Sequence, residues 1–508
     1  MKKIKIRKKT VAQILCIVLA ICMVLPFFSC MSREVTEIEI VYTGGVHGRV
    51  EADKGVVGSA LTDAFVDQVR EESGNRTLVL DCGGFLYGTQ MVNLTEGTLP
   101  FNILTETGYN AVGLGPSDFS YGGNRLGTLV SDYGLNVLCC NVYLGEERAF
   151  SPYLIKQVGR VDVAVVGVMT DDAGALSVSQ LGDLTVRDPI QSVRETLEEI
   201  GNRADLVIVL SQLGDERARA LASEVQGIDL LIEGLGGDAL PSGERIGETL
   251  LCRAGADGAS VGLARVQLRG TQVYETETAL YTGDDLRELT PDETISGLVS
   301  AAKESSMAYL AEAVGETTVP LDGERASVRR QETNFGDLVA DFARYHTGCE
   351  VALIPSENIR TSLPAGVISR GSVQTALPLD SSLVRYTVTG QQLWQLLEYS
   401  FSDYEVEGGL FPQIGGMRVS ANMTLPVGSR VTSVQIGGQP IDTARSYTLV
   451  TTEKVQSETA VQLAVEDPLA QLTAEEEYGV LTDRFITYLQ SAGPVSPAVD
   501  GRLELITG

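Results

Sequence analysis

The stretch Glu332-Thr333-Asn334-Phe335-Gly336-Asp337-Leu338-Val339-Ala340-Asp341 decides the fold of this 508-residue chain. It leads into a predicted helix at 335–345, and a second helix is predicted at 391–400. Strand-like apolar runs alternate with these helices, and a last helix is expected around 483–490. The segment 315–508 is therefore predicted to form one α/β domain.

Upstream of this domain, Thr290-Pro291-Asp292-Glu293 marks the start of a helix. A threonine followed three residues later by a glutamate is typical of a capping box, and proline is favoured at the first helical position. The helix is predicted to run to about residue 314. We therefore interpret 271–314 as a linker and connector helix.

The segment 36–270 alternates short apolar runs with longer mixed segments, which is typical of a layered α/β domain. Several of the runs lead directly into glycine-rich or polar turns, and such carboxyl ends of strands are where α/β domains build their sites. Strands are predicted at 38–42, 78–80, 136–140, 161–168, 206–210 and 228–232, and helices at 59–72 and 190–202. A chain of this length is expected to form two domains.

In order and spacing, these landmarks resemble the 5′-nucleotidase and UDP-sugar hydrolase family over nearly all of 36–506. The similarity is strongest in the second half, through the stretch quoted above, 358–360, 376–379, 411–416 and 500–502. The resemblance implies a four-layer α/β/β/α metallophosphatase sandwich at 36–270. A smaller α/β 5′-nucleotidase carboxyl-terminal domain is implied at 315–508.

The resemblance also implies a two-metal site built from five short motifs, and most of its ligand positions are altered here. The first motif retains His47 but has Gly45 in place of a carboxylate, and the bridging aspartate position is Gly84. The remaining positions carry Pro116, Ser117 and Ser120 in the third motif, Gln212 in the fourth and Leu235-Gly236-Gly237 in the fifth. Proline offers no side-chain ligand, and serine cannot replace a cationic imidazole.

We therefore expect no catalytic residues, no metal and no cofactor, with His47 as a remnant held by local packing. The predicted function is that of a catalytically inactive member of the family with a binding or scaffolding role. The alternative is an active metal-dependent phosphohydrolase with a rearranged site. Such a site would use carboxylates among Asp81, Asp118, Asp171 and Asp172.

Two arginines of the second domain, Arg329 and Arg360, correspond to the family's substrate-binding arginines. Planar guanidinium groups suit phosphate or carboxylate ligands, so the expected partner is a phosphorylated or carboxylated small molecule. The positions of the two base-stacking aromatic residues carry Leu379 and Lys454, which removes nucleobase stacking. Salt bridges from the two arginines to Glu357 or nearby acids are the alternative.

The first thirty residues have the character of an export signal: six basic residues within the first nine, then an apolar run from Ile14 to Phe28. The sequence Leu25-Pro26-Phe27-Phe28-Ser29-Cys30 resembles a lipoprotein signal with Cys30 as the acylated residue, and an uncleaved membrane anchor is the alternative. Either one predicts a location in the cell envelope, outside the cytoplasm. The formal net charge of −28 argues against nucleic acid as a partner.

Overall fold

The computed structural model describes residues 35–507 except 75, 173–180, 380 and 453–467. The expected export signal and Cys30 lie outside the described residues. The chain divides into two compact units, Met1–Ser306 and Met307–Gly508. Among the described helices, none combines the length and the apolar composition that crossing a membrane requires.

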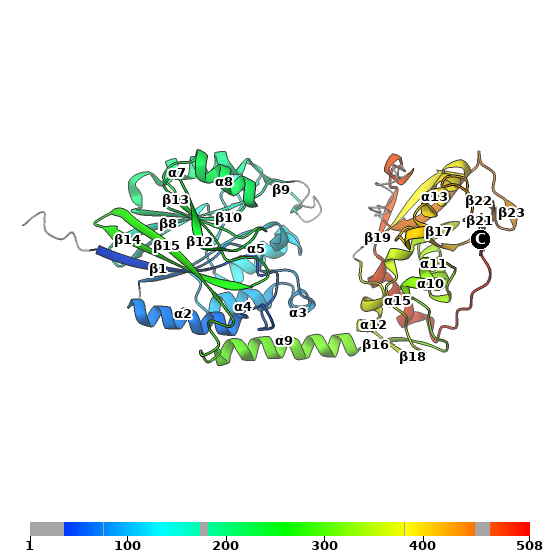
Figure 1. The fold of residues 1–508 in the computed structure, drawn as a ribbon, viewed down its shortest axis with the longest axis horizontal. Helices are drawn as coiled ribbons and strands as arrows, with labels where there is room; N and C mark the ends of the chain where they lie inside the picture. The colour runs from blue at the N-terminus through cyan, green and yellow to red at the C-terminus, as the bar shows by residue number, and fades with distance from the viewer. Residues whose placement is uncertain (1–34, 75, 173–180, 380, 453–467, 508) are drawn as a thin grey trace, which may run out of the picture. The chain divides into compact units, whose positions relative to one another are not determined.

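Two six-stranded sheets form the centre of the first unit (Figure 1). The first sheet comprises β1 (Val35–Thr43), β2 (Thr77–Asp81), β3 (Ala111–Gly113), β4 (Val137–Leu138), β14 (Ser260–Arg269) and β15 (Gln272–Thr282), in the order β15-β14-β1-β2-β3-β4. The second comprises β7 (Tyr153–Val158), β8 (Val161–Met169), β10 (Leu206–Gln212), β11 (Leu230–Glu233), β12 (Leu240–Ile246) and β13 (Thr249–Arg253), in the order β12-β13-β11-β10-β8-β7. The range assigned from sequence to the linker contains β15, which pairs along its length with β14.

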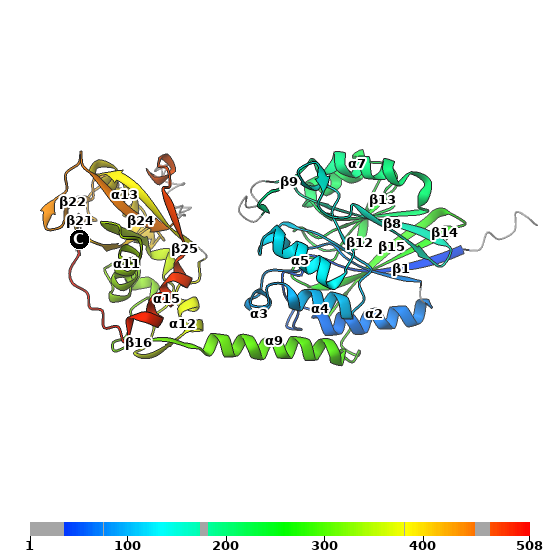
Figure 2. The ribbon, with the colours of Figure 1, turned by 180° about the vertical axis from the view of Figure 1, so that it is seen from behind.

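The two sheets pack face to face, and helices cover their outer faces (Figure 2). Leu80 of β2 and Leu210 of β10 share one buried core between the sheets. The helices are α2 (Ser59–Ser73), α3 (Gln90–Asn93), α4 (Thr98–Glu106), α5 (Gly123–Tyr133), α7 (Pro189–Ile200) and α8 (Asp215–Glu224). Phe65 of α2 packs on the first sheet, and Leu221 of α8 packs on the second. The predicted α/β/β/α sandwich is confirmed.

Short elements complete the first unit. A small third sheet contains β5 (Val142–Leu144), β6 (Glu147–Arg148) and β9 (Leu184–Val186) in the order β6-β5-β9, and single turns form η1 (Pro116–Phe119) and η2 (Gly201–Arg203). Helix α9 (Glu293–Ala311) begins in this unit. Its residues Ile295 and Val299 are buried against Ile103 of α4.

The second unit contains a five-stranded, a four-stranded and a two-stranded sheet. The first has the order β20-β17-β24-β19-β25, from β17 (Val351–Pro355), β19 (Ser382–Thr389), β20 (Pro412–Gly415), β24 (Ser446–Thr452) and β25 (Glu476–Val480). The second has the order β23-β22-β21-β26, from β21 (Met417–Asn422), β22 (Val431–Ile436), β23 (Gln439–Pro440) and β26 (Leu503–Ile506), and β16 (Ala313–Thr317) pairs with β18 (Gly366–Ser369). The helices are α10 (Arg325–Val328), α11 (Asn334–Thr347), α12 (Arg370–Ala376), α13 (Gly390–Ser400) and α15 (Leu481–Ala492), with single turns η3 (Ser356–Asn358), η4 (Tyr404–Val406) and η5 (Pro468–Gln471).

The stretch 332–341 forms the first half of α11. Thr333 caps the helix by accepting a hydrogen bond from the Gly336 N–H at 3.0 Å. Phe335 and Val339 then enter the core that α11 shares with Phe485 of α15. Gly336 has no substitute here, because a Cβ at this position would lie 2.0 Å from Oε1 of Gln413. The helix cap at Thr333, the helical spacing of Phe335 and Val339, and the close approach at Gly336 explain why these residue types occur in the stretch.

Candidate functional site

The altered motif positions of the first unit come together at the carboxyl ends of β1, β2 and β10. A Cβ placed on Gly84 would lie 3.3 Å from the Cα of Gly45 and 3.4 Å from Nε2 of Gln212. Cβ atoms placed on Gly115 and Gly234 would lie 2.8 Å and 2.6 Å from the Gln212 amide. The buried side chain of Gln212 therefore lies against the backbones of three glycines, Gly84, Gly115 and Gly234.

Asp118 is directed at the backbone of the neighbouring loops. Its carboxylate accepts hydrogen bonds from the N–H groups of Gly84 at 2.7 Å, Gly115 at 2.8 Å, Phe85 at 2.9 Å and Leu86 at 3.0 Å. Burial raises the pKa of Asp118, and these backbone donors oppose the rise. With its lone pairs taken by four backbone N–H groups, Asp118 holds the loop after β2 against η1.

Asp81 and Glu233 have similar local partners. Asp81 accepts from Thr43 Oγ1 at 2.5 Å and from the Gly83 N–H at 2.7 Å, and burial raises its pKa to about 7. Glu233 accepts from Ser211 Oγ at 2.5 Å and from backbone N–H groups of residues 213, 214 and 235. Burial raises the pKa of Glu233 as well.

The other residues of this edge offer few further metal ligands. His47 has a positive φ of 48° and places Nδ1 3.1 Å from Asp257 Oδ1, on a side chain that is 34% exposed. Asp171 forms an ion pair with Arg217, and Asp172 lies just beyond the end of β8. Pro116 begins η1 and presents only its ring. Two adjacent cations need several hard or imidazole ligands that converge, and the residues of this edge do not fit that requirement.

In the second unit, Arg329 and Arg360 lie in one cationic cluster. Arg329 is 7% exposed and donates from Nη1 to the Glu407 carbonyl at 2.6 Å. Burial lowers the pKa of Arg329, and the charges of Arg325 and Arg360 lower it further. Arg360 is exposed and donates from Nε to the Glu357 carbonyl at 2.8 Å.

The cluster also contains a third arginine, Arg325, and a half-buried acid, Glu357. Arg325 begins α10, four residues before Arg329, and sequence inspection did not single it out although this spacing places the two on one helical face. Burial raises the pKa of Glu357, while Arg360 and Arg329 lower it. Of the two positions that would hold a base, Leu379 is half-buried and Lys454 lies outside the described residues. The cluster can therefore bind an anionic group through guanidinium donors.

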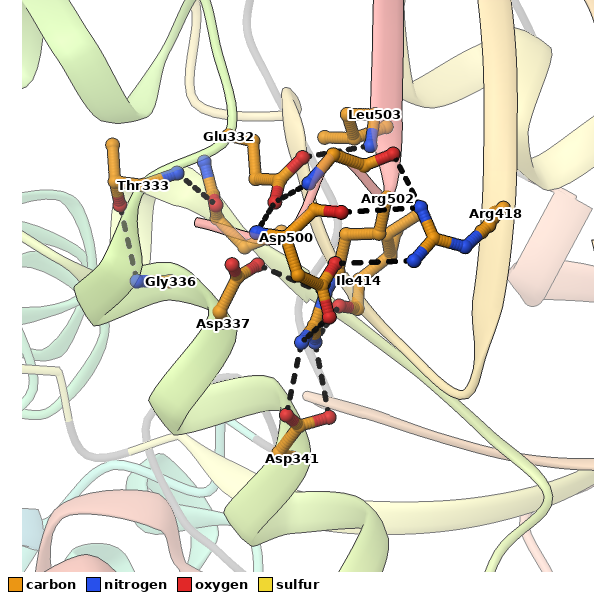
Figure 3. A network of polar contacts seen from close by, with 12 residues as sticks. Glu332, Thr333, Gly336, Asp337, Asp341, Ile414, Arg418, Asp500, Arg502 and Leu503 are labelled. Atoms are coloured by element: carbon orange, nitrogen blue, oxygen red, sulfur yellow. Dashed lines mark hydrogen bonds and ion pairs between the residues drawn. The ribbon is translucent and has the colours of Figure 1, made fainter. Parts of the chain in front are cut away.

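A second polar group joins α11 to the last strand, β26 (Figure 3). Carboxylate oxygens of Glu332, Asp337 and Asp500 all lie within 4.8 Å of one another, a spacing that could hold a metal ion. Arg502 points into the group, with Nε 3.3 Å from Asp337 Oδ1 and Nη2 3.0 Å from Asp500 Oδ2. Glu332 accepts three backbone N–H bonds from residues 500, 501 and 503. Sequence inspection assigned no ligand role to these acids.

Comparison with known proteins shows similarity to one family. The 5′-nucleotidase C-terminal domain model matches residues 313–460. The trifunctional nucleotide phosphoesterase protein YfkN of Bacillus subtilis is 25% identical over 92% of this chain, which spans only 35% of YfkN. Protein UshA of Escherichia coli is 22% identical, over 82% of this chain and 84% of UshA.

Solved structures agree with the sequence comparisons. The 5′-nucleotidase precursor of Thermus thermophilus has 25% identity and a TM-score of 0.55, over 93% of this chain and 100% of the other. A Staphylococcus aureus structure, described as a 5′-nucleotidase in complex with alpha-ketoglutarate, has 18% identity and a TM-score of 0.63, with coverage of 93% and 100%.

The prediction that the chain needs no cofactor is wrong as a statement about the whole molecule. The relatives include a nucleotide phosphoesterase and several 5′-nucleotidases, a family whose enzymes depend on two metal ions. The second unit contains three carboxylates, Glu332, Asp337 and Asp500, that could hold an ion. The sequence prediction failed because it considered only the motif positions of the first unit.

Proposed function

Because the chain belongs to the 5′-nucleotidase family, we propose that it is a ligand-binding member whose first domain does not hydrolyse phosphate esters at the family's usual edge. The observation that carries this proposal is the packing of Gln212 against the backbones of Gly84, Gly115 and Gly234, together with the close approach of Gly84 to Gly45. Activation of water and stabilisation of a phosphoryl group both need groups that face the substrate. Here the nearby carboxylates accept hydrogen bonds from the protein's own loops.

The proposed ligand is a small phosphorylated or carboxylated molecule bound through Arg329 and Arg360. Support comes from Arg329 and Arg360, which lie near Glu357 and donate their hydrogen bonds to backbone carbonyls. The alpha-ketoglutarate of the Staphylococcus aureus structure is a carboxylated molecule of this class. We further propose that residues 1–30 direct export and that Cys30 anchors the protein outside the cytoplasm.

The first test combines hydrolysis with metal analysis. The purified protein is supplied with manganese, zinc, cobalt or calcium and assayed with nucleotides, UDP-sugars and a generic phosphodiester. We expect no release of phosphate with any of these ions. Turnover that is lost in Asp81→Asn or Asp118→Asn would instead establish the alternative, a phosphohydrolase with a rearranged site.

The second test measures ligand binding by calorimetry with inorganic phosphate, alpha-ketoglutarate and AMP as probes. We expect Arg329→Ala and Arg360→Ala to weaken the binding of at least one probe about tenfold or more, the usual range for a charge-assisted hydrogen bond. Arg445→Ala is the matched control, because Arg445 is an exposed arginine paired with Glu350. If all three variants bound every probe as tightly as the wild type does, Arg329 and Arg360 would have only a structural role.

A further inference from the structure

A small cavity lies in the first unit, beside the edge that Gln212 fills. Its volume is about 50 Å³, in a measure in which one water needs about 10–15 Å³. It therefore has room for roughly three to five water-sized groups. The cavity lies between the carboxyl ends of β1 and β2, the start of α2, the end of α4 and the start of β14.

Most of the cavity wall is apolar. Phe85, Ile103 and Leu104 are buried and line one part of it, and Val57 and Val261 line another. An apolar wall of this kind favours a ligand with a short hydrocarbon chain, because moving one methylene group from water to an apolar site is favourable by about 0.8 kcal/mol. Neither proposed activity of the chain uses this wall.

Three polar groups of the wall, Thr43, Tyr109 and Asp81, are joined by hydrogen bonds. Thr43 donates its single hydroxyl hydrogen to Asp81 at 2.5 Å. Tyr109 lies 2.9 Å from the same Thr43 oxygen and must therefore donate to it. The hydroxyl hydrogen of Tyr109 is thus directed at Thr43, and that of Thr43 at Asp81. Lone pairs of the Asp81 carboxylate and of the Tyr109 oxygen are left to accept a hydrogen bond from a ligand.

Among the described residues, Arg49 is the one cationic side chain that lines the cavity; it is half exposed and lies 3.5 Å from Asp257. Asp81, by contrast, is 1% exposed, and within the described part of the chain its hydrogen-bond donors are Thr43 and the Gly83 N–H, neither of them cationic. A buried carboxylate next to an apolar wall is complementary to a small cation with a hydrocarbon tail.

We propose that this cavity binds a short aliphatic primary amine, with its ammonium group donating to Asp81 and its hydrocarbon chain against Phe85, Ile103 and Leu104. The site is independent of the anion site at Arg329 and Arg360, since it lies in the other unit. It shares Asp81 with the rearranged metal site of the alternative function, but amine binding itself requires no step of phosphoester hydrolysis.

The test is saturation-transfer NMR on the full-length protein with isobutylamine as the probe. Isobutanol and isobutyrate are the matched probes, because they keep the carbon skeleton and replace the ammonium by a neutral or an anionic group. We expect saturable binding of isobutylamine and affinities at least about tenfold weaker for the other two, since only the ammonium can form an ion pair with Asp81. Absence of saturable amine binding, or equal binding of the three probes, would overturn the proposal.

Variants locate the site. Asp81→Asn keeps the size of the side chain and removes its charge, and we expect it to weaken amine binding about tenfold or more. Asp132→Asn is the control for the acidic surface as a whole, because Asp132 is an exposed acid on α5 in the same unit. Unchanged binding in Asp81→Asn, or an equal loss in Asp132→Asn, would contradict the proposal.

A second variant covers the case in which Asp81→Asn does not fold. Ile103→Phe enlarges the apolar wall toward the cavity and leaves Asp81 in place. Its melting temperature and circular dichroism report whether the domain stays folded. We expect a folded Ile103→Phe protein to bind isobutylamine at least about tenfold more weakly, and full retention of binding would place the amine elsewhere.

Discussion

At the scale of single residues, Gly84 shows how closely the site edge is packed. Its φ of 76° lies in the left-handed region, and the Cα of Gly45 lies 3.3 Å from the place where a Cβ would sit. Restoring a carboxylate here would therefore strain the backbone and also push the two loops apart. Under the proposed function, the absence of the family's bridging aspartate at Gly84 and the close packing around this position are thus linked in one residue.

We predict that Gly84→Asp destabilises the first unit by about 2–4 kcal/mol, from the positive φ together with the steric conflict. The matched control is Gly134→Asp, at the end of α5, where φ is also positive at 63° but no atom lies within 4 Å of a Cβ. The control should cost only about 1 kcal/mol. Calorimetric melting of both variants measures the difference in stability. Equal losses of stability would show that the backbone at Gly45 moves away at little cost.

Asp337 gives a prediction for pH dependence. Burial raises its pKa to about 8, Arg502 lowers it and Glu332 raises it. Between the unfolded pKa of 3.8 and about 8, the folded protein holds a proton that the unfolded chain has lost. The contribution of Asp337 to the free energy of unfolding is therefore complete below its unfolded pKa and is lost as pH rises toward 8.

We expect the free energy of unfolding of the second unit to fall between pH 4 and pH 8, by up to about 1.4 kcal/mol per pH unit. Fluorescence of Trp394, the only tryptophan, follows this unit during denaturant unfolding because it lies on α13. Asp337→Asn should flatten the curve, whereas Asp483→Asn, at an exposed position, should leave its slope unchanged. A slope that persists in Asp337→Asn would assign the pH dependence to another group.

At the scale of elements, the sequence predicted six strands of the first unit and missed others, among them the buried strands β3, β13 and β14 and the edge strand β15. The runs at 38–42, 161–168 and 206–210 correspond to β1, β8 and β10, since a strand buried on both faces is apolar throughout. β15 is the edge strand of its sheet and is largely exposed, so its sequence lacks that signal. The start of α11 was predictable because its cap and apolar spacing are local.

The site was only partly predictable, because part of it depends on contacts between residues that are far apart in sequence. The motif positions of Gly45, Gly84 and Gln212 could be found by spacing, but the filling of the edge by Gln212 depends on loops that are far apart in sequence. The four N–H donors to Asp118 likewise come from two different loops. Arg325 was missed because the resemblance directed attention to Arg329 and Arg360.

The loop that follows β2 provides a prediction at this scale. Asp118→Asn replaces one acceptor oxygen by an NH₂ group that faces backbone donors, so we expect a loss of about 2–4 kcal/mol in stability. The control Asp132→Asn, at an exposed site on α5, should lie within about 0.5 kcal/mol of the wild type. Calorimetric melting distinguishes a structural from a catalytic role of Asp118. If Asp118 served catalysis, Asp118→Asn would lower activity and change stability little.

At the scale of the whole molecule, each unit has its own set of buried cores. The first unit holds the edge around Gln212 and the proposed amine cavity, and the second holds the arginine cluster and the carboxylate group. Under the proposed function, binding and hydrolysis are separate properties of this chain, because the arginine cluster belongs to the second unit and the altered edge to the first.

The anchor of the molecule provides the last prediction. If Cys30 is acylated, the mature chain begins at that residue, and mass spectrometry of the protein from its native host should find a lipid-modified cysteine at the amino terminus. Cys30→Ser should then leave residues 1–29 attached, whereas Cys16→Ser, within the apolar run, should leave processing unchanged. An intact amino terminus with an unmodified Cys30 in the wild type would show that the apolar run itself holds the protein in the membrane. Both results keep the arginine cluster outside the cytoplasm, but only acylation would tether it through a chain that has lost its apolar segment.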